Sequence, residues 1–220
     1  MQSPLWEQPV LRQAAGRTLR PGGFTITDRA ANFMNLLPGW RVLDVGCGLG
    51  ATVGRLRSRY GASAFGVEPS SSQLELVERN TGLIQALGTE LPFMDGSFHA
   101  LFCECVLSLL PSPKSGLKEF HRVLRPNGFL VLSDLYAKDS VQSDDKSCAA
   151  RAIPLDETRS ALHGAGFEIL LEEDHSASLK QLAARLLFSA GAESPACSCG
   201  RRGLGYYLMI VQKRGSEHAG

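Results

Sequence analysis

The sequence contains no stretch that would hold the chain in a membrane or direct it to secretion. Its apolar runs, such as residues 106–110, are much shorter than the roughly 20 residues of a transmembrane helix. Residues 1–13 are polar and include Pro4 and Pro9, a composition unlike that of a signal peptide. We therefore expect a cytoplasmic protein without a membrane partner.

The sequence also lacks an excess of charge of either sign. A net charge of +1 and a pI near 7.6 produce no extended field that would attract nucleic acid. With 220 residues, of which 44% are hydrophobic, the chain can bury one ample core. We expect a single domain with no nucleic-acid partner.

No two cysteines have the C-x-x-C spacing of a zinc site, although the chain contains six cysteines. Cys103 with Cys105, and Cys197 with Cys199, form the tighter C-x-C spacing. In a cytoplasmic protein such residues are reduced thiols rather than disulfides. We therefore predict no metal site.

The stretch over residues 40–69 carries the main motif of the chain. An apolar strand over residues 42–45 ends in a glycine loop with the sequence GCGLG, and an amphipathic segment and a second strand ending at Glu68 follow. Strand, glycine turn, helix and a strand with an acidic tip make a nucleotide-binding βαβ unit. The loop satisfies the G-x-G-x-x-A spacing of dinucleotide-binding proteins, so an NAD-dependent oxidoreductase is one interpretation.

Asp44, two residues before the first glycine of this loop, favours a different ligand. A carboxylate there would repel the pyrophosphate of a dinucleotide, which binds to backbone N–H groups at a helix N-terminus. The same carboxylate suits a ligand that carries a sulfonium and an ammonium group. The acid therefore favours S-adenosylmethionine over NAD.

Strands and helices are predicted to alternate along most of the chain, which indicates a doubly wound α/β fold. Beyond the βαβ unit, strands are predicted over residues 83–86, 98–106, 129–132, 167–171 and 205–212. Helices are predicted over residues 25–37 (with Thr27 or Asp28 as N-cap), 73–80, 114–124, 155–165 and 178–188.

Three tracts together identify a resemblance to a known family. They are DVGCGLG at the glycine loop, LPF at residues 91–93 and RVLRPNG at residues 122–128. Over about residues 25–135 the chain resembles the class I S-adenosylmethionine-dependent methyltransferases, of the type 11 group that includes ubiquinone-biosynthesis and arsenite methyltransferases. The resemblance implies a Rossmann-like fold with a mostly parallel, seven-stranded sheet whose final strand is antiparallel. It also implies S-adenosyl-L-methionine as cofactor and S-adenosyl-L-homocysteine as product.

The resemblance assigns most cofactor contacts by position. Gly46 and Gly48 would lie against the methionine part, where a Cβ would collide with the ligand. Asp44 would contact its amino group, Glu68 would accept hydrogen bonds from both ribose hydroxyls, and Pro69 would help to shape the adenine slot.

The chain departs from the family pattern at the adenine end. Leu87 stands where relatives often have an aspartate, so packing and the Gly88–Thr89 backbone would hold the adenine. His99 stands where relatives usually have an aspartate, and is a surface or strand-end histidine rather than a catalytic base. The full set of predicted cofactor residues is Asp44, Gly46, Cys47, Gly48, Glu68, Pro69, Gly88, Thr89 and Glu104.

Two cysteines are candidates for substrate binding. The tract of residues 105–109 resembles one in arsenite methyltransferases, and Cys148 falls near the place of another arsenic-binding cysteine there. Soft thiolates suit As(III), so a thiophilic substrate held by Cys105 and Cys148 is an alternative. A further family cysteine, soon after the glycine loop, is missing from this chain.

The function that the resemblance implies is in-line SN2 transfer of a methyl group to a small-molecule acceptor, with no catalytic residue assigned. A non-catalytic subunit that binds S-adenosylmethionine is a further alternative, and the protein is expected to be a monomer or a homodimer.

We expect a loosely held arm over residues 1–22, a methyltransferase domain over 23–214 and a tail over 215–220. Within the domain, 135–153 is a lid candidate and 174–203 an insertion.

Overall fold

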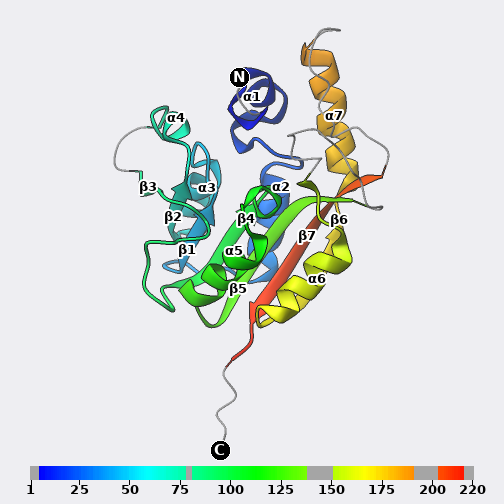
Figure 1. Cartoon of the computed structure of the whole chain (residues 1–220). Coiled ribbons are helices and arrows are strands. Elements are labelled where there is room, and N and C mark those ends of the chain that lie inside the picture. The colour runs from blue at the N-terminus through cyan, green and yellow to red at the C-terminus, as the bar shows by residue number, and fades with distance from the viewer. Residues whose placement is uncertain (1–4, 78–80, 138–150, 191–202, 216–220) are drawn as a thin grey trace, which may run out of the picture.

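The computed structural model describes residues 5–77, 81–137, 151–190 and 203–215. These residues form a seven-stranded sheet with helices on both faces (Figure 1). The strand order is β3-β2-β1-β4-β5-β7-β6, and β7 runs antiparallel to both of its neighbours. The other pairings, β1 with β2 and β4, β2 with β3, and β4 with β5, are parallel. The predicted fold class is confirmed.

The strands are β1 (Arg41–Val45), β2 (Ser63–Glu68), β3 (Leu83–Gln85), β4 (Phe98–Glu104), β5 (Leu124–Ala137), β6 (Phe167–Asp174) and β7 (Leu204–Lys213). The helices are η1 (Leu5–Glu7), α1 (Pro9–Ala15), η2 (Gly16–Thr18), α2 (Phe24–Phe33), α3 (Ala51–Tyr60), α4 (Ser71–Leu74), η3 (Leu107–Leu109), α5 (Pro113–Val123), α6 (Leu155–Gly164) and α7 (Ser176–Ala190).

Two apolar layers hold the helices on the sheet. On one face α2 and α3 pack through residues such as Ile26 and Leu56 against the alternate residues of β1, β4 and β7. On the other face α5 and α6 pack through residues such as Phe120 and Leu162. The central strands are apolar on both sides because both faces are covered, as is usual in parallel sheets.

The chain order reverses between β1 and β4, which are neighbours at the centre of the sheet. In open α/β sheets the ligand site lies at this switch point, beyond the carboxyl ends of the strands. Acidic residues stand at or near three of these ends: Asp44 near the end of β1, Glu68 at the end of β2 and Glu104 at the end of β4. The topology therefore brings residues that are far apart in sequence to one edge.

The N-terminal segment is more ordered than the sequence suggested. In place of a loosely held arm, η1, α1 and η2 form a helical segment that packs on α7, and both α1 and α7 lie beyond the carboxyl edge of the sheet (Figure 1). Leu11 and Ala14 of α1 are buried together with Leu182 and Leu186 of α7. The two helices form a small apolar cluster of their own.

Three other predicted elements have different bounds. Helix α2 begins at Phe24 after Gly23, not at a Thr27 or Asp28 cap, and this buries Thr27. The tract of residues 69–72 predicts a cap for the next helix, and the Ser70 side chain does accept from Gln73 N–H at 3.3 Å. Helix α4 nevertheless ends at Leu74, and residues 78–80 lie outside the described residues. Strand β5 continues to Ala137 because its pairing with β7 extends that far, so the first residues of the predicted 135–153 loop are strand.

Within the described ranges, no helix has both the length and the apolar character that crossing a membrane requires.

Helices α2 and α3 are joined by an ion pair whose contribution depends on pH. The Asp28 carboxylate accepts hydrogen bonds from Arg55 Nε at 3.1 Å and Nη2 at 2.6 Å, and from Tyr60 Oη at 3.1 Å. The hydrogen bonds from Arg55, above all, lower the pKa of Asp28. A carboxyl with a lowered pKa stabilises the fold above its ordinary pKa, and this contribution is lost as the pH falls through the native pKa.

Asp28→Asn should lower the free energy of unfolding at pH 7 by about 0.5–1 kcal/mol, a modest value because the pair is partly exposed to solvent. The difference from wild type should shrink as the pH falls below 3.8, the ordinary pKa. Urea unfolding of both proteins at several pH values measures this difference in the free energy of unfolding. Asp156→Asn is the control, since Asp156 is 92% exposed and its pair with Arg159 should have no measurable effect. Equal effects of both variants at every pH would contradict the prediction.

Candidate functional site

A cavity of about 260 Å³ lies at the carboxyl edge of the sheet. Its floor comes from the ends of β1, β2, β4 and β5 and from the glycine loop. Its other walls come from the N-terminal segment, from η3 and from α7. Each of the predicted cofactor residues, Asp44, Gly46, Cys47, Gly48, Glu68, Pro69, Gly88, Thr89 and Glu104, lines this cavity.

Gly46 turns the chain at the end of β1. Its φ is +69°, and a Cβ on it would lie 2.3 Å from Cγ2 of Val106. The N–H groups of Gly46 and Cys47 donate to the Val67 carbonyl at 2.8 and 3.0 Å, which ties the loop to β2. Packing against Val106 is therefore a structural reason for glycine at this position, separate from the approach of a ligand that the sequence suggested.

Gly48 is different because the space beside it is open. Its φ is +50°, and the nearest atom to a Cβ would be Cδ1 of Leu19, at 3.6 Å. Leu19 itself lines the cavity. A side chain at position 48 would thus enter the cavity region without meeting the protein core.

Glu68 is held by the loop it faces. Its carboxylate accepts hydrogen bonds from Gly48 N–H at 2.9 Å and from Ser70 N–H at 3.0 Å, one on each oxygen. Burial raises the pKa of Glu68, and these two N–H groups oppose the rise. Each oxygen has a second acceptor position, so the carboxylate can still receive two hydroxyl donors side by side.

Asp44 is a buried carboxylate, 4% exposed, for which the described residues provide no hydrogen bond. Burial raises its pKa well above the usual range, and the nearby carboxylates of Glu104 and Glu68 add to the rise, while Arg20 opposes it. A buried carboxylate without a hydrogen bond is costly for the fold. It is well suited to pair with a cationic group of a ligand.

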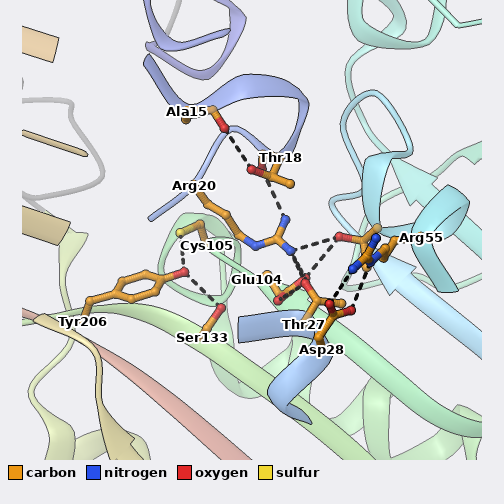
Figure 2. A network of polar contacts seen from close by, with 11 residues as sticks. Ala15, Thr18, Arg20, Thr27, Asp28, Arg55, Glu104, Cys105, Ser133 and Tyr206 are labelled. Atoms are coloured by element: carbon orange, nitrogen blue, oxygen red, sulfur yellow. Dashed lines mark hydrogen bonds and ion pairs between the residues drawn. The ribbon is translucent and has the colours of Figure 1, made fainter. Parts of the chain in front are cut away.

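The Glu104 carboxylate differs from that of Asp44 because it has a partner within the protein, Arg20 (Figure 2). Arg20 Nη2 lies 2.6 Å from Glu104 Oε2, and both side chains are nearly inaccessible to solvent. Thr27 and Thr52 accept from the same guanidinium nitrogen and donate to the carboxylate. Arg20 was not predicted as a site residue, and no motif or periodicity around it could have revealed the contact.

The side of the cavity away from the glycine loop is apolar. Leu11 of α1 and Leu182 and Leu186 of α7 contribute buried side chains to it. Other large apolar residues that line the cavity include Leu5, Trp6, Leu109, Leu110, Leu135 and Leu179. The predicted helix over residues 178–188, which is part of α7, therefore contributes to the wall of the cavity.

Two of the cysteines in the described part of the chain, Cys47 and Cys105, line the cavity. Cys105 lines it with a φ of +59°, and its Sγ lies 3.2 Å from Tyr206 Oη (Figure 2). Cys103 is fully buried in β4, and Cys47 packs in the core beside Gly66. Cys148 lies outside the described residues. Across the described part of the chain, no group of three or more His, Cys, Asp or Glu side chains could hold a metal ion.

The two positions at which the chain departs from the family pattern, Leu87 and His99, lie at different places. Leu87, Gly88 and Thr89 line the cavity beside Pro69. His99 stands at the opposite end of β4, where its Nδ1 accepts from Arg41 N–H at 3.1 Å and its ring stacks on Trp40. Its position is that of the surface histidine that the sequence indicated.

Residues 43–132, which include the glycine loop, β2, β4 and most of β5, match the family described as "Methyltransferase domain". Curated relatives include the methyltransferase GfsG of Streptomyces halstedii, 27% identical over 70% of this chain and 59% of that protein. An arsenite methyltransferase of Aquipseudomonas alcaligenes is 32% identical over 61% of this chain and 42% of that protein. The chain thus spans about half the length of these relatives.

Solved structures with the same fold include enzymes of different kinds. A phosphoethanolamine N-methyltransferase of Haemonchus contortus, in complex with S-adenosyl-L-methionine, matches with a TM-score of 0.76 at 16% identity, over 93% of this chain and 56% of that one. The [4+2]-cyclase SpnF matches with a TM-score of 0.73 at 23% identity, over 87% and 81%. At these identities the similarity establishes the fold alone.

The contact between Gly46 and Val106 can be tested by its effect on stability. Gly46→Ala should lower the free energy of unfolding by about 2–4 kcal/mol, because a Cβ adds steric overlap to the strain of a positive φ. Gly39→Ala is the matched control: φ is +80° there, but no atom lies within 4 Å of the new Cβ. That variant should lose only about 1–2 kcal/mol.

Chemical denaturation measures both variants. Adding Val106→Ala to Gly46→Ala should recover part of the loss. Equal losses for the two glycine variants, with no recovery, would show that the overlap with Val106 is not the reason for glycine at position 46.

Proposed function

We propose that this chain, which belongs to the class I S-adenosylmethionine-dependent methyltransferases, transfers a methyl group to an uncharged, apolar small molecule. Members of this family take S-adenosyl-L-methionine as cofactor and release S-adenosyl-L-homocysteine. The observation that carries the proposal is the division of one cavity into two parts. Asp44 and Glu68 line it at and beside the glycine loop, and Leu11, Leu182 and Leu186 line it from α1 and α7.

The residues at the loop end fit the cofactor. Asp44 offers a buried carboxylate with no hydrogen bond from the described residues, which suits an ammonium group. Glu68 has one remaining acceptor position on each oxygen, which suits the two ribose hydroxyls. We assign Pro69, Leu87, Gly88 and Thr89 to the adenine, by packing and backbone contact.

Bound S-adenosylmethionine would supply a methyl group on a positively charged sulfur, which leaves as a neutral thioether when a nucleophile attacks in line. The protein's part is to place the two reactants and to keep water away from them. For an apolar acceptor, Leu11, Leu182 and Leu186 would both position the acceptor and exclude water. The carboxylates of Asp44 and Glu68 would keep the cofactor in place through its ammonium group and its ribose hydroxyls.

The described cavity residues do not include a dedicated base. No histidine is among them, and burial raises the pKa of Asp134 to about 6. Asp134 already accepts from Ser108 N–H at 2.9 Å, Ser108 Oγ at 3.0 Å and Leu135 N–H at 2.8 Å, so we assign it to holding η3. The acceptor that suits this site is a neutral molecule whose acidic O–H or C–H group can lose its proton to water without a base from the protein, such as an acidic phenol or a 1,3-dicarbonyl compound.

The alternatives receive less support. A thiophilic substrate needs two or three thiolates; Cys105 lines the cavity but Cys103 does not, and burial raises the pKa of the Cys47 thiol, which also lines it. Oxidoreduction with NAD would place a pyrophosphate beside the buried Asp44. A cofactor-binding subunit without catalysis would have no use for the leucine wall.

Asp44→Asn should change stability and cofactor affinity in opposite directions. Removal of a buried charge should raise the free energy of unfolding by on the order of 1 kcal/mol at pH 7. Loss of the partner of the ammonium group should weaken S-adenosylmethionine binding by about ten- to a hundredfold. Chemical denaturation and titration calorimetry measure the two effects.

The control is Glu75→Gln, which removes the same charge from an exposed position and should alter neither quantity. Unchanged affinity in Asp44→Asn would remove Asp44 from the cofactor site. Binding of NAD but not of S-adenosylhomocysteine by the wild type would overturn the proposed function.

Leu186→Ala should raise the KM for an apolar acceptor and leave the affinity for S-adenosylhomocysteine unchanged. Leu187→Ala, one residue further on the same helix, is the control, since Leu187 is 68% exposed and Leu186 only 5%. Transfer of a labelled methyl group to a panel of phenols, enolisable ketones and phosphorylated amines provides the measurement. Preference for the charged amines would contradict an apolar acceptor.

A further inference from the structure

Helix α7 exposes two large apolar residues near its C-terminal end. Leu187 is 68% exposed and Phe188 is 89% exposed, the highest value for a large apolar side chain in the described part of the chain. The exposed Ala184 precedes them by three and four positions, so the three side chains lie on one face of the helix. The opposite face carries Leu182 and Leu186, which pack against α1 and line the cavity. Helix α7 thus exposes an apolar strip on its outer side.

The helices around this strip carry charge of one sign. The sequences of α1, η2 and α7 contain no Asp or Glu, and they contain four cations, Arg12, Arg17, Lys180 and Arg185. Arg17, Lys180 and Arg185 are exposed, and none of the four forms an ion pair with another described residue. Because the rest of the chain has more acidic than basic residues, the net charge of +1 conceals this local positive excess.

The acids that adjoin these helices in the sequence are engaged elsewhere. Glu7 of η1 accepts a hydrogen bond from Ser70 Oγ at 2.9 Å, on the side of α4. Asp174 accepts from Ser176 N–H at 2.8 Å at the start of α7, about 20 Å along the helix from Phe188. The last turns of α7, which lie beyond the carboxyl edge of the sheet (Figure 1), therefore combine apolar and positively charged side chains.

We propose that α1, η2 and α7 dock together on a lipid bilayer with anionic headgroups. The residues that form this docking surface are Arg12, Arg17, Lys180, Arg185, Leu187 and Phe188. The two apolar side chains would enter the boundary between headgroups and acyl chains, and the cations would pair with lipid phosphates. A helix that binds in this way lies along the membrane surface and does not cross it.

A second copy of the chain fits the docking surface less well than a bilayer does. In a symmetric dimer the surface would meet its own image, so that its four cations would face four others. Like charges brought together across an interface cost free energy, whereas anionic headgroups neutralise them. The charge of the surface therefore favours lipid as its partner.

The docking surface is the outer side of the helices that wall the cavity. Leu11, Leu182 and Leu186 line the cavity from the inner side of the same helices. An apolar acceptor dissolved in the bilayer would thus have a short path to the cavity, a consequence that rests on the proposed function. The docking itself requires neither cofactor nor methyl transfer, so its failure would leave the proposed function in place.

Sedimentation with sucrose-loaded vesicles tests the docking. The wild type should bind vesicles made of equal parts of phosphatidylcholine and phosphatidylglycerol, but not vesicles of phosphatidylcholine alone, and added salt should weaken the binding. Phe188→Ser should lower the partition coefficient about ten- to hundredfold, because a large apolar side chain no longer leaves water. Arg185→Gln should lower it roughly fivefold.

Matched controls come from other surfaces of the molecule. Met94→Ser replaces an apolar residue that is 82% exposed, and Lys118→Gln removes an exposed cation of α5, so both variants should bind as the wild type does. Phe188→Ser should keep the wild-type midpoint of urea unfolding, since its side chain is exposed. Equal binding to both kinds of vesicle, or to neither, would overturn the proposal.

Two further outcomes would assign the docking surface to another partner. A loss of binding in Arg185→Gln with none in Phe188→Ser would indicate soluble polyanions, because insertion into lipid needs the apolar side chain. A wild-type dimer in analytical ultracentrifugation that Phe188→Ser converts to a monomer would indicate a second copy of the chain. Either result would overturn docking on lipid.

Discussion

The buried ion pair between Arg20 and Glu104 connects two parts of the molecule that are far apart in the sequence. It fastens the segment before α2 to the end of β4, with Thr27 of α2 and Thr52 of α3 around it. Such a pair adds little net stability, since desolvation offsets much of the attraction, but removal of one partner is costly. Its effect is to specify one arrangement, in which α1 and α7 close the cavity.

The residues that line the cavity come from two parts of the chain. The acidic end belongs to the strand edges and the glycine loop, within residues 43–132 that match the family. The leucines that α1 and α7 contribute to the cavity lie outside that range. This division agrees with a common cofactor and a varied acceptor, because one fold can carry different chemistry when the elements above the sheet edge change.

Local sequence patterns were sufficient to predict most of the fold. The βαβ unit, the Ser70 cap and the alternation that gives a doubly wound sheet were all readable, because short apolar runs, glycines and capping residues act over a few positions. The N-terminal helices were missed because their apolar residues are few and are buried only against α7. The far end of β5 was missed because its pairing with β7, not its own sequence, decides where it ends.

The sequence by itself determined the glycine loop, the order of the elements and the acids Asp44 and Glu68 at the strand ends. All of these depend on neighbours in the chain. Only the tertiary structure decided that Gly46 packs on Val106, that Glu104 holds Arg20, and that leucines from both ends of the chain share one wall. Those contacts join residues from about 60 to more than 150 positions apart, and burial in one shared core is what brings them together.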